Sequence, residues 1–324
     1  MKSAFVGPRG LRPGWGFAIF AVLWTVLSAG LQVAVSLVYR HHAGMDPRDF
    51  LVSDGLSLAA TFVVLVLMAR IEERSVGDYG LSFAPGFVRR WAAGLVWGLA
   101  PVAVVMLGIR LLGGVEFHGW AMSGGALAGW AAIWAISMVV LGLFEETLFR
   151  GYPLVTLARG MGFWPAAVLL SVIFGALHYF TKPMESLLDA VSVALIGLFA
   201  CYTFRRTGDL WLAAGFHTAF DFFALGFFGA PNTGNGGKPV PFHLLATTFH
   251  GPAWLTGGPC GMEASVLMIA TMGMLFLIFG RVGADHTRRN ANSEDPPPGA
   301  TYAIGTPCPT AGQPDPSSTT SDRA

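Results

Sequence analysis

The chain has 324 residues, of which 53% are hydrophobic and only 12% are charged, about half the charged fraction of an ordinary soluble domain. With a mean hydropathy of +0.57, this composition excludes a soluble globular protein and predicts an integral membrane protein. The net charge of +1 and the scattering of charges between apolar blocks argue against a nucleic-acid partner. The three cysteines lack metal-ligand spacing and are too few for a disulfide framework.

Apolar blocks long enough to cross a bilayer, which takes roughly 20 residues, recur along the chain. We therefore expect an all-α, polytopic membrane fold with about eight transmembrane helices. The second and sixth blocks are the weakest, because each spans the bilayer only with its flanking residues included. The expected helices cover residues 15–39, 51–70, 91–112, 126–149, 163–180, 186–204, 209–228 and 263–281.

The distribution of Lys and Arg predicts the orientation of these helices. With eight spans and both termini in the cytoplasm, 15 of the 20 Lys and Arg residues fall on the cytoplasmic side, as the positive-inside rule requires. We expect a multi-pass protein, in the cytoplasmic membrane if the source is bacterial, with a transmembrane domain at 1–283. Residues 284–324 carry seven prolines and many Ser and Thr, so they are expected to form a disordered cytoplasmic tail.

The stretch LFEETLFRGYP, at the end of the fourth block, places three charged groups where charge is costly. Each carboxylate or guanidinium near the bilayer centre costs about 2.5–3.5 kcal/mol, so these groups must face protein, water or each other. Glu146 and Arg150 have the i, i+4 spacing of a helical ion pair, with the acid first. Glu145 lies about 100° away around the helix and is left free by that pair.

Two later blocks carry further ionisable groups at helical spacing: Phe174 and His178 share one face, as do His217 and Asp221. A turn at 159–162 would place Glu145 and His178 about 16 and 17 residues from it, hence at similar depth. His217 lies only about nine residues past the next turn, at 206–208. It can join the other two only if the first hairpin projects about 10 Å beyond the second.

A free glutamate, two histidines and a further carboxyl group in a half-dry site suit hydrolysis of an amide. A desolvated glutamate can act as the general base that activates water. The same groups can instead hold a divalent metal such as Zn²⁺ that acidifies the water, with Glu145, His178 and His217 as the candidate ligands. The residues leave both versions open.

In order and on separate blocks, the patterns EExxxR, FxxxH and HxxxD resemble those of the CPBP (CAAX protease and bacteriocin-processing, or ABI) intramembrane proteases, which include the Ras-converting CaaX endopeptidase. The resemblance covers about residues 125–228, the expected catalytic core. It implies an intramembrane endopeptidase, either a metalloprotease or a glutamate protease. The site residues it implies are Glu145, Glu146, Arg150, His178, His217 and Asp221.

The resemblance also implies a role for each of these residues. Glu145 would be the water-activating base, assisted by His178, while Glu146 and Arg150 would organise the site. His217 would bind the reacting carbonyl or a metal. In the prenyl-protein branch the last position of the third pattern is asparagine, a hydrogen-bond donor, whereas Asp221 donates only if it is protonated. Asp221 can instead orient His217.

Two other classes of membrane protein remain as alternatives. A proton-coupled transporter would also bury Glu, His and Asp, but would be expected to show paired broken helices in corresponding halves, which the sequence does not indicate. A non-catalytic immunity or scaffold protein would be expected to lose at least one of the three patterns. We therefore expect a peptidase whose partners are a peptide or membrane-protein substrate and the lipid bilayer; the sequence carries no signal of oligomeric state.

Overall fold

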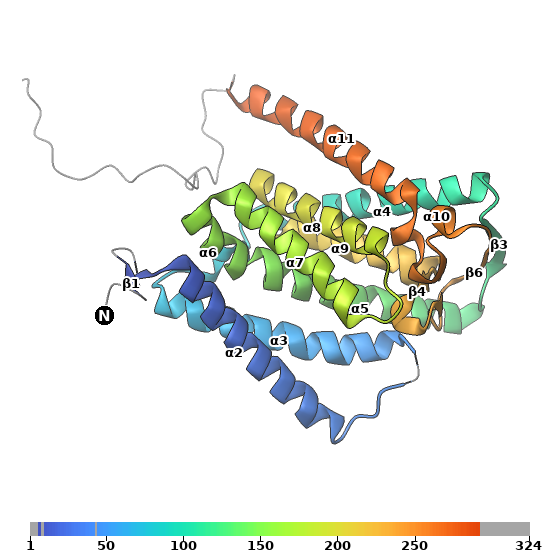
Figure 1. Ribbon diagram of the computed structural model, residues 1–324, viewed down its shortest axis with the longest axis horizontal. Helices are drawn as coiled ribbons and strands as arrows, with labels where there is room; N and C mark the ends of the chain where they lie inside the picture. The colour runs from blue at the N-terminus through green and yellow to red at the C-terminus, as the bar shows by residue number, and fades with distance from the viewer. Residues whose placement is uncertain (1–5, 8–9, 43, 292–324) are drawn as a thin grey trace, which may run out of the picture.

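The computed structural model describes residues 6–7, 10–42 and 44–291, and shows a bundle of long helices with a small region of loops and short strands at one end (Figure 1). The long helices are α2 (Pro13–Ser36), α3 (Pro47–Ile71), α4 (Phe87–Leu111), α5 (Gly124–Arg150), α7 (Phe163–Thr181), α8 (Leu187–Thr207) and α11 (Val266–Ala291). The shorter helices are α6 (Tyr152–Met161), α9 (Trp211–Asp221) and α10 (Ala253–Thr256), with short 3₁₀ turns η1 (Val76–Tyr79), η3 (Thr233–Asn235), η4 (Gly258–Cys260) and η5 (Met262–Ala264), and a π-helix, η2 (Phe222–Phe227).

The few strands form three small antiparallel pairs. They are β1 (Val6–Gly7) with β2 (Gly10–Leu11), β3 (Val115–Trp120) with β6 (Leu245–Phe249), and β4 (Pro231–Asn232) with β5 (Lys238–Pro239). The β3–β6 pair joins the loop after α4 to the long segment after η2, at the end of the bundle where α5 begins (Figure 1). The long Gly- and Pro-rich segment thus packs against that end of the bundle.

Six stretches in the described part of the chain are long and apolar enough to cross a membrane, so the protein is an all-α, multi-pass membrane protein. They coincide with the first six expected blocks, and the fourth, Gly124–Met161, includes both α5 and α6. The seventh block consists of the 11-residue α9 continued by η2, and the apolar part of the eighth is Val266–Val282. The expected number of eight therefore exceeds the number of full-length apolar helices, because these last two are shorter.

Two expectations about the ends of the chain are not tested by the described residues. The cytoplasmic placement of both termini stays a prediction. The expected tail lies outside the described residues from 292 onward, and 284–291 continue helix α11.

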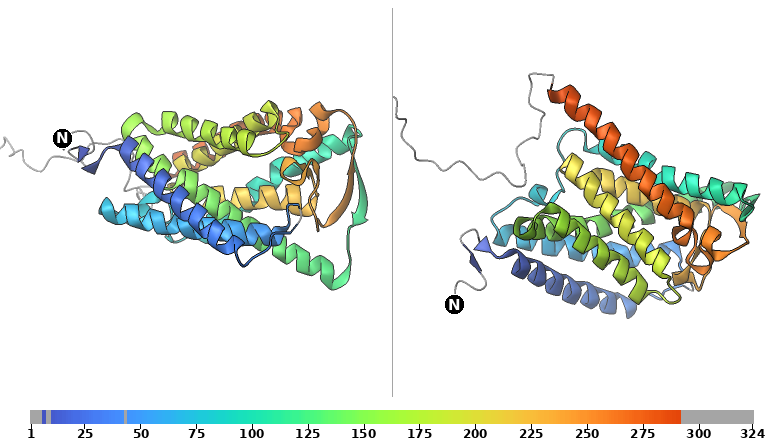
Figure 2. Two further views of the ribbon diagram at one scale, coloured as in Figure 1. Left: turned by 60° about the horizontal axis from the view of Figure 1, so that its bottom comes forward. Right: turned by 45° about the horizontal axis from the view of Figure 1, so that its top comes forward.

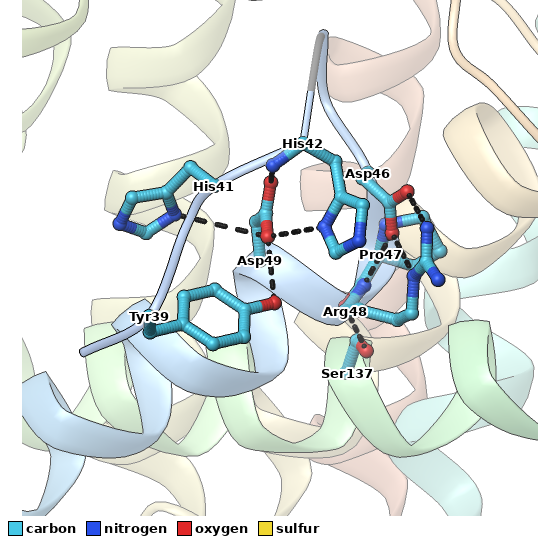
Figure 3. Close-up of polar contacts among 8 residues, drawn as sticks. All are labelled: Tyr39, His41, His42, Asp46, Pro47, Arg48, Asp49 and Ser137. Carbon is cyan, nitrogen blue, oxygen red and sulfur yellow. Dashed lines mark hydrogen bonds and ion pairs between the residues drawn. The ribbon is translucent and has the colours of Figure 1, made fainter. Parts of the chain in front are cut away.

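The start of α3 is fixed by a dense set of polar contacts (Figure 3). Asp46 caps the helix and forms two hydrogen bonds with the Arg48 guanidinium. Asp49 accepts hydrogen bonds from Tyr39 Oη (2.8 Å) and from the backbone N–H of His42 (2.7 Å). Ser137 in α5 donates to the carbonyl oxygen of Pro47 (2.6 Å), so the first turn of α3 is tied directly to α5.

At the other end of the bundle, Glu72 holds several elements together. Its carboxylate accepts hydrogen bonds from the hydroxyls of Tyr152 (2.5 Å) and Tyr79 (3.0 Å), and pairs with Arg159 (2.5 Å). Because Tyr152 and Arg159 belong to α6, this network fixes α6 against the end of α3. Helix α6 is thus a separate short helix after α5, not a continuation of it.

Helix α9 lies in the middle of the bundle, between α4, α5 and α8 (Figure 2). All its residues from Trp211 to Phe220 are buried. Glycines make this close packing possible: a Cβ on Gly98 of α4 would collide with the backbone carbonyl of Phe216, and one on Gly215 would collide with that of Trp91. The α4–α9 contact is therefore backbone against backbone, which holds α9 in place with little freedom to shift.

Replacing Gly98 by alanine should separate α4 from α9, because the added methyl group meets main-chain atoms that cannot rotate away. We expect a loss of about 1–3 kcal/mol in stability, the usual cost of overpacking. Thermal unfolding of the purified protein in detergent measures it. The matched control is Gly129→Ala in α5, where the new Cβ meets nothing within 4 Å; equal melting temperatures for the two variants would contradict the packing argument.

Candidate active site

The three sequence patterns meet at His217, in the middle of α9. Its Nδ1 donates to Glu146 Oε1 (2.9 Å), and its Nε2 lies 3.1 Å from Asp221 Oδ2 and 3.5 Å from Glu145 Oε2. With these carboxylates ionised, both ring nitrogens face acceptors, and this arrangement favours the protonated, positively charged imidazole. His217 is thus held by carboxylates on both sides.

The ion pair predicted from the spacing of Glu146 and Arg150 is confirmed, with Arg150 Nη1 3.1 Å from Glu146 Oε1. Both side chains are almost completely buried, at 2% and 1% exposure. Glu145 points away from this pair toward His217 and remains 17% exposed. Because removing one partner of a buried pair leaves an unpaired charge, at a cost of about 3–5 kcal/mol, Arg150 is a structural requirement for the position of Glu146.

Arg150 is held in a narrow space formed by α7 and α8. Its guanidinium carbon lies 4.7 Å from the centre of the Phe174 ring, a cation–π distance. On the other side is Gly197 of α8, where a Cβ would lie 2.5 Å from Arg150 Nη2. A glycine at this position therefore makes room for the guanidinium, which the sequence patterns did not indicate.

His178 faces the same centre from α7. Its ring packs edge-to-face on Phe174, with centroids 4.6 Å apart, and Phe174 in turn contacts the His217 ring at 6.4 Å. His178 Nδ1 donates to the carbonyl oxygen of Phe174 (2.9 Å), because a carbonyl can only accept. In the neutral ring this leaves Nε2 as a free lone pair, able to accept a proton or a hydrogen bond but not to donate one.

The expected convergence of the three helices is therefore present, although His178 and Glu145 make no hydrogen bond or ion pair with each other among the described contacts. Both instead share His217 and Asp221 as electrostatic neighbours. The expected mismatch in depth between His217 and the other groups is absent in the structure. Helix α6 inserts ten residues between α5 and α7, and so moves the turn at 159–162 away from the site.

Three further ionisable groups interact with this centre and were missed by the sequence patterns. Asp54 of α3 and Glu263 of η5 each interact electrostatically with His217 and Asp221, and Lys182, one turn after His178, interacts with Glu145. Desolvation raises the pKa of Glu263, and Lys182 opposes the rise. A pattern search could not find them, because each is a lone charge beside an apolar block and comes close only through the packing of other helices.

The candidate metal ligands do not have an arrangement that fits a metal. In the described part of the chain, no group of three or more His, Cys, Asp or Glu side chains could hold an ion. Both nitrogens of His217 already donate to carboxylates, whereas a metal needs a nitrogen lone pair. Of the two histidines among the candidate ligands, only His178 has a ring nitrogen with a free lone pair.

Comparison with known protein families agrees with this site. Residues 126–223 match the family model described as type II CAAX prenyl endopeptidase Rce1-like, and this stretch contains all three patterns. Over this stretch the match supports the resemblance of the motifs to the CPBP (CAAX protease) family. It supports a CAAX-type intramembrane protease in general terms, a hydrolase whose substrate is a peptide or protein. A comparison with curated proteins found no significant match.

The Gly197→Ala variant should impair the site without replacing any of its charged residues. The added Cβ takes the place of Arg150 Nη2, and the Phe174 ring blocks the opposite side, so the guanidinium can no longer stay level with Glu146. We expect proteolytic activity to fall about tenfold or more, as small misplacements in active sites do. Cleavage assays compare it with Gly55→Ala, a helical glycine with open space around it; equal activities would contradict the role of this glycine.

Proposed function

We propose that the protein is an endopeptidase that hydrolyses peptide bonds of a peptide or membrane-associated protein with a water activated by Glu145. The observation that carries this proposal is the division of labour between the two adjacent glutamates. Glu146 is committed to Arg150 and His217, whereas Glu145 is the partly exposed carboxylate at the edge of the same centre. A general base needs such a position, with one oxygen free to take a proton from water.

In the proposed reaction, Glu145 removes a proton from a water molecule as the water oxygen attacks the carbonyl carbon of the scissile bond. The free Nε2 of His178 accepts the second hydrogen bond of that water and so orients it. The tetrahedral intermediate then collapses as the carbon–nitrogen bond breaks, and Glu145 returns the proton to the leaving amine. The His217 imidazolium favours the ionised form of Glu145 before the attack, because its Nε2 lies 3.5 Å from Glu145 Oε2.

The remaining residues of the site hold His217 in position and balance its charge. Asp221 and Glu146 hold His217 through its two nitrogens, and Arg150 compensates the charge of Glu146. No step in this scheme uses a metal, since His217 has no free lone pair. The proton-coupled transporter and the non-catalytic scaffold are the alternatives that the following experiment separates from a peptidase.

The replacement of Glu145 by glutamine should abolish cleavage, because an amide cannot take the proton from water. We expect a loss of about 10²–10⁴-fold in kcat, the usual contribution of a general base. Purified protein in lipid nanodiscs is incubated with a library of peptides and membrane proteins, with prenylated and unprenylated arms, and the products are identified by mass spectrometry.

The matched control for this variant is Glu116→Gln, at an exposed glutamate of strand β3 whose side chain is 59% exposed. This control should cleave as the wild type does. Folded wild-type protein that cleaves nothing in any arm would contradict the proposal and favour the transporter or scaffold.

Removal of divalent metals should leave activity unchanged, because the scheme has no metal-dependent step. The wild type is treated with a strong chelator, its metal content is measured by mass spectrometry, and cleavage is assayed before and after zinc is added back. A loss of activity that zinc restores would show instead that Glu145, His178 and His217 rearrange to bind a metal.

A further inference from the structure

Asp54 is a partly buried carboxyl group for which neither the three patterns nor the reaction scheme has a use. It lies two turns into α3, and its Oδ2 is buried with no hydrogen-bond partner among the described residues. Buried polar groups almost always have a partner, and an unpaired buried carboxylate costs several kcal/mol. A side chain retained at such a cost calls for a functional explanation.

The packing of α3 and α5 places Asp54 level with the general base. The two helices lie against each other and run in the same direction (Figure 1), and Ser137 Oγ joins α5 to Pro47 at the start of α3 (Figure 3). From that contact, Asp54 is seven residues along α3, about 10 Å, and Glu145 is eight residues along α5, about 12 Å. The electrostatic neighbours of Asp54 are accordingly Glu145, Asp221 and His217.

The charges around Asp54 favour its neutral form. The centre already contains four acidic side chains, Glu145, Glu146, Asp221 and Glu263, against the three basic side chains His217, Arg150 and Lys182. A further carboxylate there would have a buried oxygen without a partner, beside an excess of groups of the same sign, and a group in that position keeps its proton instead. A neutral carboxylic acid carries one O–H donor.

The proposed reaction requires such a donor, because negative charge develops on the carbonyl oxygen during the attack. Apart from Lys182 and Glu263, the other side chains at the centre have none to spare. Both N–H groups of His217 are directed to carboxylates, His178 has only a lone pair free, and Asp221 accepts from His217. Asp221 therefore does not supply the hydrogen bond that an asparagine would supply at its position.

We propose that Asp54 is a further catalytic residue, which in its neutral form donates a hydrogen bond to the oxygen of the scissile carbonyl. The proposal rests on the peptidase function proposed above. Asp54 keeps its proton throughout: as the water oxygen bonds to the carbonyl carbon, the carbonyl π electrons move to the oxygen, and the Asp54 O–H strengthens its hydrogen bond to it. The bond weakens again when the intermediate collapses.

Two substitutions of Asp54 distinguish a role as hydrogen-bond donor from a role as ionised carboxylate. Asp54→Ala removes the donor and should lower kcat by about 10²-fold or more, the usual loss for an oxyanion donor, with little change in KM. Asp54→Asn keeps the size and supplies an N–H donor, so it should retain activity within about tenfold of the wild type. Its melting temperature should be no lower than that of the wild type, because no paired charge is lost.

The control on the same helix is Gly55→Ala, which adds a methyl group into open space and should leave activity unchanged. Wild-type activity in Asp54→Ala would overturn the proposal. An Asp54→Asn variant as inactive as Asp54→Ala would also overturn it, since a required carboxylate is not a neutral donor. A large loss in Lys182→Met together with full activity in Asp54→Ala would assign the donor to Lys182 instead.

Infrared spectroscopy tests the neutral state without any substrate. The wild type should show the C=O stretching band of a protonated carboxylic acid at neutral pH, and the difference spectrum against Asp54→Asn should contain that band. Its absence from the difference spectrum would overturn the proposal even if the protein is an active peptidase. Its presence in a protein that cleaves nothing would show that only the peptidase function has failed.

Discussion

The site depends on a buried ion-pair chain, in which Arg150 pairs with Glu146 and Glu146 pairs with His217. Charges inside a membrane protein are tolerated only when they are paired, and this chain pairs a cation, an anion and a second cation across α5 and α9. Because each member needs the next, the helices cannot slide or rotate independently without leaving a buried charge unpaired. The ion pairs therefore set the depth and rotation at which α5 and α9 meet.

The rest of the bundle is arranged so that this chain can form. Glycines at the α4–α9 contact bring α9 into the middle of the bundle, Gly197 admits the guanidinium, and the hydrogen bond between Ser137 and Pro47 sets α3 beside α5. As a consequence, the two adjacent glutamates differ in role. Glu146 is held in buried ion pairs, whereas Glu145 stays partly exposed. A difference of 100° around one helix is sufficient for that division.

Much of this protein was predictable from periodicity and composition. The first six helices lie where the apolar blocks predicted them, and the Glu146–Arg150 pair follows from i, i+4 spacing alone. The break after Arg150 was less predictable, because the separate course of α6 depends on Glu72, almost 80 residues earlier. The shortness of α9 was also missed, since its π-helical continuation has the same composition as a transmembrane helix.

The sequence by itself determined the class of the protein and the three patterns of its site, because hydrophobicity and helical spacing are local properties that a chain carries wherever it folds. Only the tertiary structure decided which groups meet. It brought Asp54 and Glu263 into electrostatic contact with His217 and Lys182 into electrostatic contact with Glu145, and it placed Asp221 Oδ2 3.1 Å from the imidazole Nε2. Those contacts join residues on different helices, and their distances depend on how closely the backbones approach, which no spacing within one helix records.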